Sequence, residues 1–510
     1  MKNWRLNIFL LLFFILAAII ISRLFYLQIL KSKFYLSQAL GQQVGFQEIK
    51  GSRGEIFFAN NNDSDSSKVK NLATNEERWM IFAIPKEIEN KDKFAEILNK
   101  SIKETIKPDR GLTKKYIISK LEKSDSYVLI EKDLSIKDID NIKKLKLKGL
   151  YWEKVQSRYY PETNFASQVI GFLGGDSIGQ YGIEGYYENI LKGKTGIKEE
   201  KRGLESIDYQ DLSSLNGSDI YLTIDYNIQF EAELLLREAR KNIDIDSGQI
   251  IVIKPDSGKI LALANFPNFN PNEYSKENNL DIFQNVITQK IFEPGSVLKP
   301  FTMAIALNEG KVSPESKFED TGFVKIGPNT IYNFDRKKYG WQDMSGILEK
   351  SINIGAVYLS QLISRQTFLD YFDKFGFNNK TNIELQGEVY SSNETLKKSL
   401  GSIGLATASF GQGIEMTPIQ LVKAFSIFAN QGKIVKPYIV EKIVHGDEEA
   451  KTQIETTGNI ISAKTASQVT QMMINVVDRG FGSGAKINGY YLAGKTGTAQ
   501  IPFEDKKGYY

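Results

Sequence analysis

An uncharged stretch near the N-terminus limits what this chain can fold into more than any other feature. Residues 6–22 read LNIFLLLFFILAAIIIS, and basic residues flank the stretch on both sides. A helix over residues 6–27 is long enough to cross a hydrocarbon core of roughly 30 Å. The alternative is a cleaved signal peptide, but the stretch exceeds a usual signal core and no small-x-small cleavage site follows it. We therefore predict an uncleaved transmembrane signal anchor, preceded by a cytoplasmic tail of residues 1–5.

The rest of the chain has the composition of folded material. At 510 residues it is too long for one core, so roughly two to four domains are expected. Hydrophobic residues make up 41% and charged residues 25%, which is ordinary for folded domains. The 65 basic and 61 acidic residues leave a net charge of +4, without the concentrated basic excess of a nucleic-acid-binding chain. We therefore expect no nucleic-acid partner.

The cysteine and histidine counts exclude several kinds of active site. Without cysteine there are no disulfides, thiolate nucleophiles, zinc ribbons or iron–sulfur clusters. The single histidine, His445, lies in IVHGD, which reads as a strand end running into a turn, so we interpret it as structural. A Ser-His-Asp triad needs an imidazole beside the nucleophile, and a zinc site normally uses more than one His or Cys. An enzyme of this sequence needs another base, and lysine is the candidate.

The texture of the sequence changes after Gly217. Residues 34–217 are mixed and rich in Lys, Asp, Glu and Asn, with a polar loop at residues 60–67. Residues 86–146 alternate Lys/Glu helix faces with short apolar runs, most simply solvated helix faces, and no motif there predicts chemistry. This half is therefore expected to be a non-catalytic domain.

The second half combines strands with a helical block. A strand is expected at residues 219–224, followed by a helix from Asp225 to Arg240. Further strands are expected at residues 249–253 and 259–264, joined by a Pro-Asp-x-Gly turn, and at 438–444 and 490–500. The segment between residues 290 and 440 is mostly helical. Strands on both sides of a helical block predict an α/β sandwich.

The first of three short motifs is PGSVLK at residues 294–299, which opens an apolar helix. Ser296 and Lys299 are three apart and share one helix face, and Pro300 is tolerated in the first turn. The positive potential of a helix N-terminus stabilises a developing alkoxide. Desolvation favours a neutral Lys299 amine, which can take the Ser296 proton. A helix cap with a solvated lysine explains this motif equally well when it is taken alone.

The second motif is Ser351-Ile352-Asn353, after a helix-like segment. On a loop, the Ser351 hydroxyl can relay a proton while the Asn353 amide holds a substrate amide. The alternative is a helix cap, which both residue types favour.

The third motif is KTGT at residues 495–498. A strand from Tyr490 would present the Lys495 charge and the Thr496 and Thr498 hydroxyls along one edge, and Gly497 would let a substrate backbone approach. The same triplet at residues 194–196 lies in the loop-like LKGKTGIKEEK, so only the later copy fits.

Each motif has copies elsewhere, such as Ser67/Lys70 and Ser483/Lys486, but their order and setting do not recur. In this order the sequence resembles the penicillin-binding protein and serine β-lactamase superfamily, and is most similar to monofunctional class B penicillin-binding transpeptidases. Further blocks carry the same resemblance: RGEI at 53–56, RYYP at 158–161, VIGF at 169–172, YGIEG at 181–185, LTID at 222–225, FGQG at 410–413 and TPIQ at 417–420.

The resemblance implies an α+β or α/β architecture in two parts. Residues 34–217 would form an elongated mixed pedestal of the dimerisation type. Residues 218–510 would form a transpeptidase domain with an antiparallel sheet sandwiched by helices. Family members usually continue past the third motif with two strands and a terminal helix. The chain ends at Tyr510, so the last strands and helix would be missing, through a fragmentary sequence or a truncation.

The resemblance also implies a peptidoglycan D,D-transpeptidase. Ser296 would attack the D-Ala-D-Ala carbonyl of a stem peptide, with Lys299 as base and with Ser351 and Lys495 as proton relay and electrostatic shell. A neighbouring amine would then take the acyl group. No metal or organic cofactor is implied.

Substrate-binding roles follow from the same likeness. Thr496 and Thr498 would hold the substrate carboxylate beside Gly497, and Asn353 the peptide amide. The N–H groups of Ser296 and Thr498 would form an oxyanion hole, worth roughly 3 kcal/mol per donor.

Partners and location are likewise implied by the resemblance. The expected partners are stem peptides, β-lactam antibiotics, the membrane, a polytopic glycan polymerase and other divisome or elongasome proteins; the likeness leans toward the septal branch. The chain would cross the cytoplasmic membrane once, with its catalytic domain outside. Two alternatives remain: a D,D-carboxypeptidase or β-lactamase-type hydrolase, and an inactive truncated scaffold. The anchor, the pedestal and the missing Glu-x-x-Leu-Asn motif argue against a lactamase.

Overall fold

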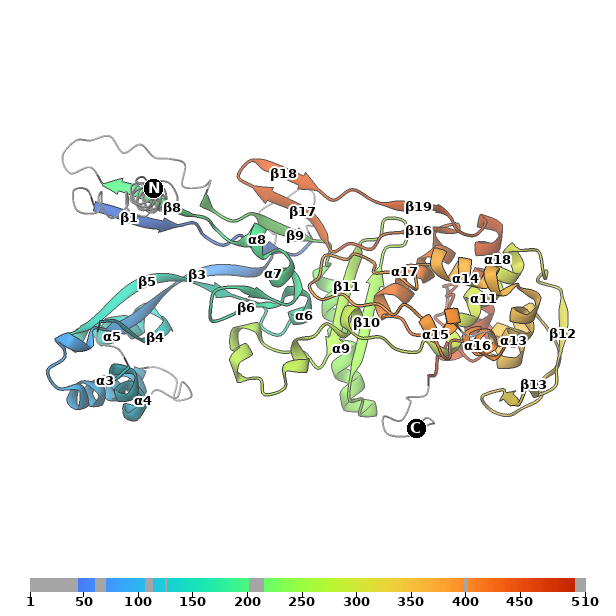
Figure 1. Cartoon of the computed structure of the whole chain (residues 1–510), viewed down its shortest axis with the longest axis horizontal. Helices are drawn as coiled ribbons and strands as arrows, with labels where there is room; N and C mark the ends of the chain where they lie inside the picture. Colours follow the sequence, from blue (N-terminus) through green and yellow to red (C-terminus); the bar gives the residue numbers. More distant parts are fainter. Residues whose placement is uncertain are drawn as a thin grey trace, which may run out of the picture. The chain divides into compact units, whose positions relative to one another are not determined.

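The computed structural model of the chain describes residues 45–59, 70–105, 113–123, 126–200, 215–398 and 402–499 (Figure 1). The predicted anchor at residues 6–27 and the polar loop at 60–67 lie outside these ranges. Among the helices inside them, none combines the length and the hydrophobicity that a membrane crossing requires. Contacts divide the chain into two units, of which the smaller holds residues 1–54, 190–218 and 445–447.

The smaller unit contains a two-stranded antiparallel sheet of β1 (Gly45–Lys50) and β8 (Thr195–Glu200). The Gly51 N–H extends the pairing by donating to the Lys194 carbonyl at 2.9 Å. The triplet at residues 194–196 therefore enters a strand, and the loop predicted there is wrong. Strand β1 supplies a continuous row of backbone hydrogen-bond partners for this segment, and the local sequence pattern does not indicate that pairing.

His445 ends strand β17 (Val440–His445), and a turn follows it, as predicted. Its Nδ1 lies 3.2 Å from the Ser218 hydroxyl oxygen. This contact gives the imidazole a structural partner.

In the larger unit, the polar half of the chain folds around the long strand β3 (Asn71–Ala83). It pairs antiparallel with β4 (Val128–Leu134) and β5 (Leu150–Tyr159). Apolar side chains of these strands share one core with three helices: α3 (Lys91–Thr105), α4 (Lys114–Leu121) and α5 (Ile136–Lys144). Helix α5 buries Ile139 and Ile142 and leaves most of its charged residues in solvent. The charged faces predicted here are therefore confirmed as solvated.

Strand β3 belongs to a seven-stranded sheet of order β18-β17-β9-β2-β3-β4, with β5 paired to β3. The remaining strands of this sheet are β2 (Ile56–Phe57), β9 (Asp219–Leu222) and β18 (Glu448–Lys451). Strand β2 runs parallel to β9, so the sheet joins the two halves of the sequence.

Several short helices and strands lie outside this sheet: α6 (Ser167–Ile170), β6 (Phe172–Leu173), β7 (Gly179–Gln180), α7 (Gly182–Tyr186), α8 (Glu188–Leu191), α10 (Val286–Gln289) and α15 (Glu394–Lys398).

The start of the second half folds as predicted. The Asp225 carboxylate accepts from the N–H of Asn227 at 2.8 Å and caps helix α9 (Tyr226–Ile243). The predicted hairpin is formed by β10 (Gly248–Ile253) and β11 (Ile260–Phe266), and α9 packs on it. In the described part of the chain, this sheet is limited to the hairpin and a single parallel bridge from Lys259 to Tyr438. The wider sandwiched sheet that we predicted is not formed there.

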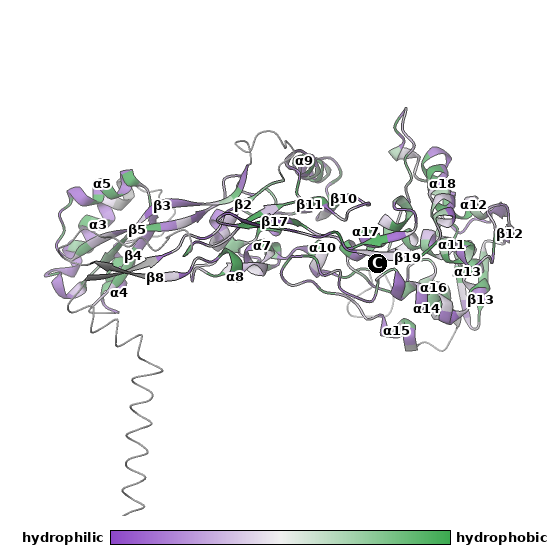
Figure 2. Ribbon diagram, turned by 90° about the horizontal axis from the view of Figure 1, so that it is seen from above, coloured by the Kyte–Doolittle hydropathy of each residue, from purple (hydrophilic) through white to green (hydrophobic). Residues whose placement is uncertain are grey.

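A helical block follows the hairpin and holds the largest core. Its helices are α11 (Lys299–Asn308), α12 (Met344–Glu349), α13 (Asn353–Leu362), α14 (Arg365–Lys374), α16 (Ser402–Ala408), α17 (Pro418–Ala429) and α18 (Ala463–Arg479). Three ribbons border the block: β12 (Lys317–Asp320) with β15 (Gly340–Asp343), β13 (Phe323–Ile326) with β14 (Asn329–Tyr332), and β16 (Lys433–Val435) with β19 (Thr456–Asn459). Hydrophobic and hydrophilic residues alternate along α18 (Figure 2), which buries one face from Thr465 to Val477.

The strand predicted at residues 490–500 is wrong for residues 490–499, which have no regular secondary structure. A strand needs a neighbour that completes its backbone hydrogen bonds. None of the strands in the described ranges pairs with this segment. Lys495 therefore reaches the site from an irregular segment.

Candidate active site

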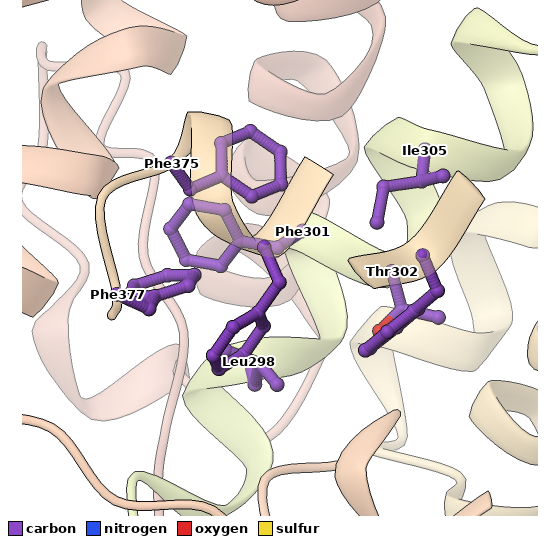
Figure 3. A pocket seen from close by; sticks show the side chains of 8 residues that line it. Leu298, Phe301, Thr302, Ile305, Phe375 and Phe377 are labelled. Carbon is purple, nitrogen blue, oxygen red and sulfur yellow. The ribbon is translucent and has the colours of Figure 1, made fainter. Parts of the chain in front are cut away.

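Ser296 lies in a single turn of 3-10 helix, η8 (Gly295–Leu298), that runs directly into α11. The Ser296 carbonyl accepts from the Lys299 N–H, so the two residues are stacked one turn apart as predicted. Phe301 anchors the start of α11, because its ring packs against Phe375 and Phe377 at centroid distances of 5.0 and 5.2 Å (Figure 3). Aromatic packing therefore fixes the backbone that carries Ser296 and Lys299.

The Lys299 amine is buried and lies within hydrogen-bonding distance of three polar atoms. Its side chain is only 1% exposed. Its Nζ lies 2.5 Å from the Ser351 carbonyl oxygen, 2.7 Å from Asn353 Oδ1 and 3.2 Å from Ser351 Oγ. Within the described residues it makes no ion pair, so no carboxylate offsets the loss of hydration. The site therefore holds a lysine that is bound only by neutral groups.

Ser351 occupies a turn between α12 and α13 with φ at +51°. The turn aims both its carbonyl and its hydroxyl at Lys299, while Asn353 begins α13. Ile352, not Ser351, stands at the N-cap position, and its side chain makes no capping bond. The cap interpretation of this motif is therefore wrong for Ser351.

Lys495 meets the same hydroxyl from the other side. Its Nζ lies 2.9 Å from Ser351 Oγ and 2.8 Å from the Thr496 carbonyl oxygen. The Ser351 oxygen thus lies between two lysine amines. The side chains of Lys299, Ser351, Asn353 and Lys495 form one connected hydrogen-bond network.

Burial shifts both lysines toward the neutral form. It holds the pKa of Lys299 well below its usual range, and the nearby Lys495 charge lowers it further. Burial also lowers the pKa of Lys495 to about 8. Burial thus disfavours the charged form of both amines, and with a pKa of about 8 most Lys495 amines stay protonated at neutral pH.

Two close approaches place Ser296 beside the third motif. Gly295 has φ at +59°, and a Cβ there would come within 2.7 Å of the Thr498 carbonyl oxygen. A Cβ on Gly497 would come within 2.7 Å of Val297 Cγ1. The residues on both sides of Ser296 therefore touch residues 497 and 498. Neither the Ser296 N–H nor the Thr498 N–H donates a hydrogen bond to another described residue.

One predicted contact is not made. The Ser296 hydroxyl forms no hydrogen bond within the described part of the chain, and Lys299 binds Ser351 and Asn353 instead. Catalytic hydrogen bonds often form only when substrate is bound. The structure brings the second and third motifs together with Lys299, but the described residues include no hydrogen bond between the Ser296 hydroxyl and the Lys299 amine.

The sequence did not single out Glu293, which helps to hold the Ser296 loop. Its Oε1 accepts from the Gly413 N–H at 3.0 Å, and the Gly295 N–H donates to the Gly411 carbonyl at 3.0 Å. Burial raises the pKa of Glu293, and its Oε2 is buried with no hydrogen-bond partner among the residues that the structure describes. The Gly-rich block at residues 410–413 was the available signal, because it lies directly against the turn before Ser296.

We predict a bell-shaped pH profile for acylation of Ser296. The second-order rate constant should rise with pH as Lys299 loses its proton, and fall as pH passes about 8, where Lys495 loses its charge. A Lys495→Arg variant keeps its charge at high pH and should lose the alkaline fall, even where its maximum rate is lower. Stopped-flow labelling from pH 5 to 10 measures both profiles; an unchanged alkaline limb in the variant contradicts the assignment.

Comparison with known families agrees with this arrangement. The family of the penicillin-binding protein transpeptidase domain matches residues 248–510, and that of the penicillin-binding protein dimerisation domain matches residues 48–222. The chain belongs to the class B penicillin-binding proteins. This confirms the family that the sequence resembles, and with it the coarse prediction of a dimerisation domain followed by a transpeptidase domain.

Relatives of this penicillin-binding protein match it along most of its length. It is 32% identical to stage V sporulation protein D of Bacillus subtilis, over 97% of this chain and 76% of the relative. It is 29% identical to the probable peptidoglycan D,D-transpeptidase PenA of Neisseria meningitidis, over 98% of this chain and 82% of the relative. Its fold is similar to the crystal structure of penicillin-binding protein 2X from Streptococcus thermophilus. That comparison has a TM-score of 0.69 at 22% identity and covers 91% and 72% of the two chains.

Proposed function

We propose that this penicillin-binding protein is a peptidoglycan D,D-transpeptidase with Ser296 as its nucleophile. Ser296 Oγ forms an ester with the penultimate D-Ala carbonyl of a stem peptide, and the terminal D-Ala leaves with the proton. An amine of a second stem then attacks the ester, forms the cross-link and returns the proton to Ser296. The observation that carries this proposal is the buried, carboxylate-free Lys299 one turn from Ser296, in a chain without a suitable imidazole.

The hydrogen-bond network supports a proton relay. A neutral amine has two N–H donors and one lone pair, and the Ser351 carbonyl and Asn353 Oδ1 take the two donors. The Ser351 hydroxyl can then donate to the Lys299 lone pair while it accepts from Lys495. Rotation of this hydroxyl away from Lys299 exposes the lone pair to Ser296, so the relay can switch the base on when substrate arrives.

Substrate binding uses the groups that the network leaves available. The N–H groups of Ser296 and Thr498 form the oxyanion hole, and Thr496 and Thr498 hold the terminal carboxylate beside Gly497. The Asn353 Oδ1 accepts one hydrogen bond from Lys299, and its Nδ2 donates one to the Tyr332 carbonyl. Each of these atoms can form one more hydrogen bond, and Asn353 uses them to bind the peptide amide. β-Lactams react at the same serine because they present the same carbonyl and carboxylate.

The cellular setting is part of the proposal. Residues 6–27 anchor the protein in the cytoplasmic membrane, with residues 34–217 as pedestal and 218–510 as catalytic domain on the outer side. A polytopic glycan polymerase and other divisome or elongasome proteins are the proposed partners, with the septal role preferred.

Product analysis tests the reaction. The full chain is incubated with a D-Ala-D-Ala stem peptide, with and without an added D-amino acid as acceptor amine. We expect D-Ala release and a new amide to the acceptor that outcompetes the free acid. Release of free acid alone would identify a D,D-carboxypeptidase. Absence of both products, with no fluorescent-penicillin label on the protein, would favour the inactive scaffold.

A further inference from the structure

An exposed aromatic strip borders the Ser351–Asn353 turn. Its rings are Phe323, Tyr332, Phe334 and Phe481, which are between 44% and 65% exposed. Phe323 faces Tyr332 across the β13–β14 ribbon, with ring centroids 6.2 Å apart. The Phe334 and Phe481 rings meet edge to face at 5.7 Å. Clusters of large exposed rings on a protein surface commonly mark a binding site.

The strip is built into the site by backbone contacts. Asn353 Nδ2 donates to the Tyr332 carbonyl at 3.0 Å, so the strip begins one hydrogen bond from the Lys299 network. The Phe481 N–H donates to the Glu349 carbonyl at 3.0 Å, two residues before Ser351. The strip therefore touches both sides of the turn that carries the relay hydroxyl.

Buried Asn333 turns its two aromatic neighbours outward. Its side-chain N–H groups donate to the Asp320 carboxylate at 2.9 and 3.1 Å and to the Lys337 carbonyl at 2.9 Å. Tyr332 ends strand β14 and Phe334 lies in the turn that follows, so the two rings flank this anchored residue, and both are exposed to solvent. Their exposure is thus fixed by the fold.

A cation without a carboxylate partner lies over the strip. The Arg336 guanidinium stands 4.9 Å above the Tyr332 ring, and within the described residues it forms no ion pair. The adjacent Asp335 carboxylate is taken by the Tyr339 hydroxyl at 2.6 Å and by Lys337 at 3.7 Å. Arg336 has φ at +56°, in the left-handed region that is uncommon outside glycine. The strip thus combines apolar rings with one positive charge available to a ligand.

We propose that this strip and Arg336 bind the part of the stem peptide that precedes D-Ala-D-Ala, with Arg336 holding a free carboxylate of that peptide. This inference rests on the proposed function, which places the peptide amide at Asn353. A peptide advances about 3.3–3.6 Å per residue, so a chain that leaves Asn353 along the strip reaches Arg336 within a few residues. Apolar parts of the peptide lie on the rings, and its free carboxylate pairs with the Arg336 guanidinium.

The test compares two stem pentapeptides, one with free side-chain carboxylates and one with these groups amidated, and a fluorescent penicillin that lacks the stem. Arg336→Gln should lower kcat/KM for the free-carboxylate peptide about five-fold, the scale of an exposed ion pair. It should leave the amidated peptide and the penicillin unchanged. Lys337→Gln removes the same charge one residue away and should leave all three unchanged.

A second variant tests the rings. Phe323→Ala combined with Phe334→Ala should lower kcat/KM for both peptides about ten-fold and spare penicillin labelling. The inference fails if Arg336→Gln affects both peptides equally or neither, if Lys337→Gln has the same effect, or if the double variant slows penicillin to the same extent. A wild-type chain that penicillin does not label would instead refute the proposed function.

Discussion

Replacing Lys299 with methionine should slow acylation of Ser296 by roughly 10²–10⁴-fold, the range for loss of a general base. Methionine matches the unbranched apolar stem of lysine, and the side chain at position 299 is already shielded from solvent. The second-order rate constant for fluorescent-penicillin labelling measures the effect. Ser296 remains in place, so slow labelling of the same serine is expected at long incubation times.

The same variant should keep or gain thermal stability. Burying an amine without a carboxylate opposes folding, and methionine removes that desolvation. The gain is partly offset, because the Ser351 carbonyl and Asn353 Oδ1 each lose a donor. An unchanged or higher unfolding midpoint together with slow labelling separates lost catalysis from lost structure. Rapid labelling of the folded variant would contradict the role of Lys299 as base.

Ser296→Ala should abolish covalent labelling altogether, because the alanine side chain has no oxygen to form the ester. Ser296 is half-buried and its hydroxyl bonds to none of the described residues, so its loss should change the free energy of unfolding by no more than about 0.5 kcal/mol. Mass spectrometry of the labelled wild-type chain should find the adduct on the peptide that contains Ser296.

Ser483→Ala is a matched control for this experiment. It removes a serine that also stands three residues before a lysine, but Lys486 is solvent-exposed and pairs with Asp478 at 3.1 Å. This variant should label at the wild-type rate. A label that survives Ser296→Ala, or that is lost in Ser483→Ala, would show that the nucleophile has been misassigned.

Local patterns predicted much of the fold. Asp225 caps α9, the Pro-Asp-x-Gly turn joins β10 to β11, and Lys299 opens a buried helix, because each depends on residues close in sequence. The prediction that Lys299 is desolvated also followed from its apolar helix, and the structure agrees.

Local patterns did not predict the secondary structure of the two copies of Lys-Thr-Gly. The copy at residues 194–196 enters strand β8, and the copy at residues 495–497 is in no strand, the reverse of the prediction. Strand formation depends on a partner segment, and β1 lies about 150 residues from β8 in sequence, which local texture cannot report. Lys495 is nonetheless the copy that reaches Ser351, since tertiary contact and not strand geometry selects it.

The bond from Lys299 to the main-chain oxygen of residue 351 makes the location of the amine independent of the hydroxyl of that residue. A main-chain oxygen is present whatever side chain the residue carries. The lysine can therefore keep its location while the hydroxyl beside it is exchanged for another group. Substitution of residue 351 can thus change the rate of proton transfer without displacing the Lys299 amine that accepts the proton.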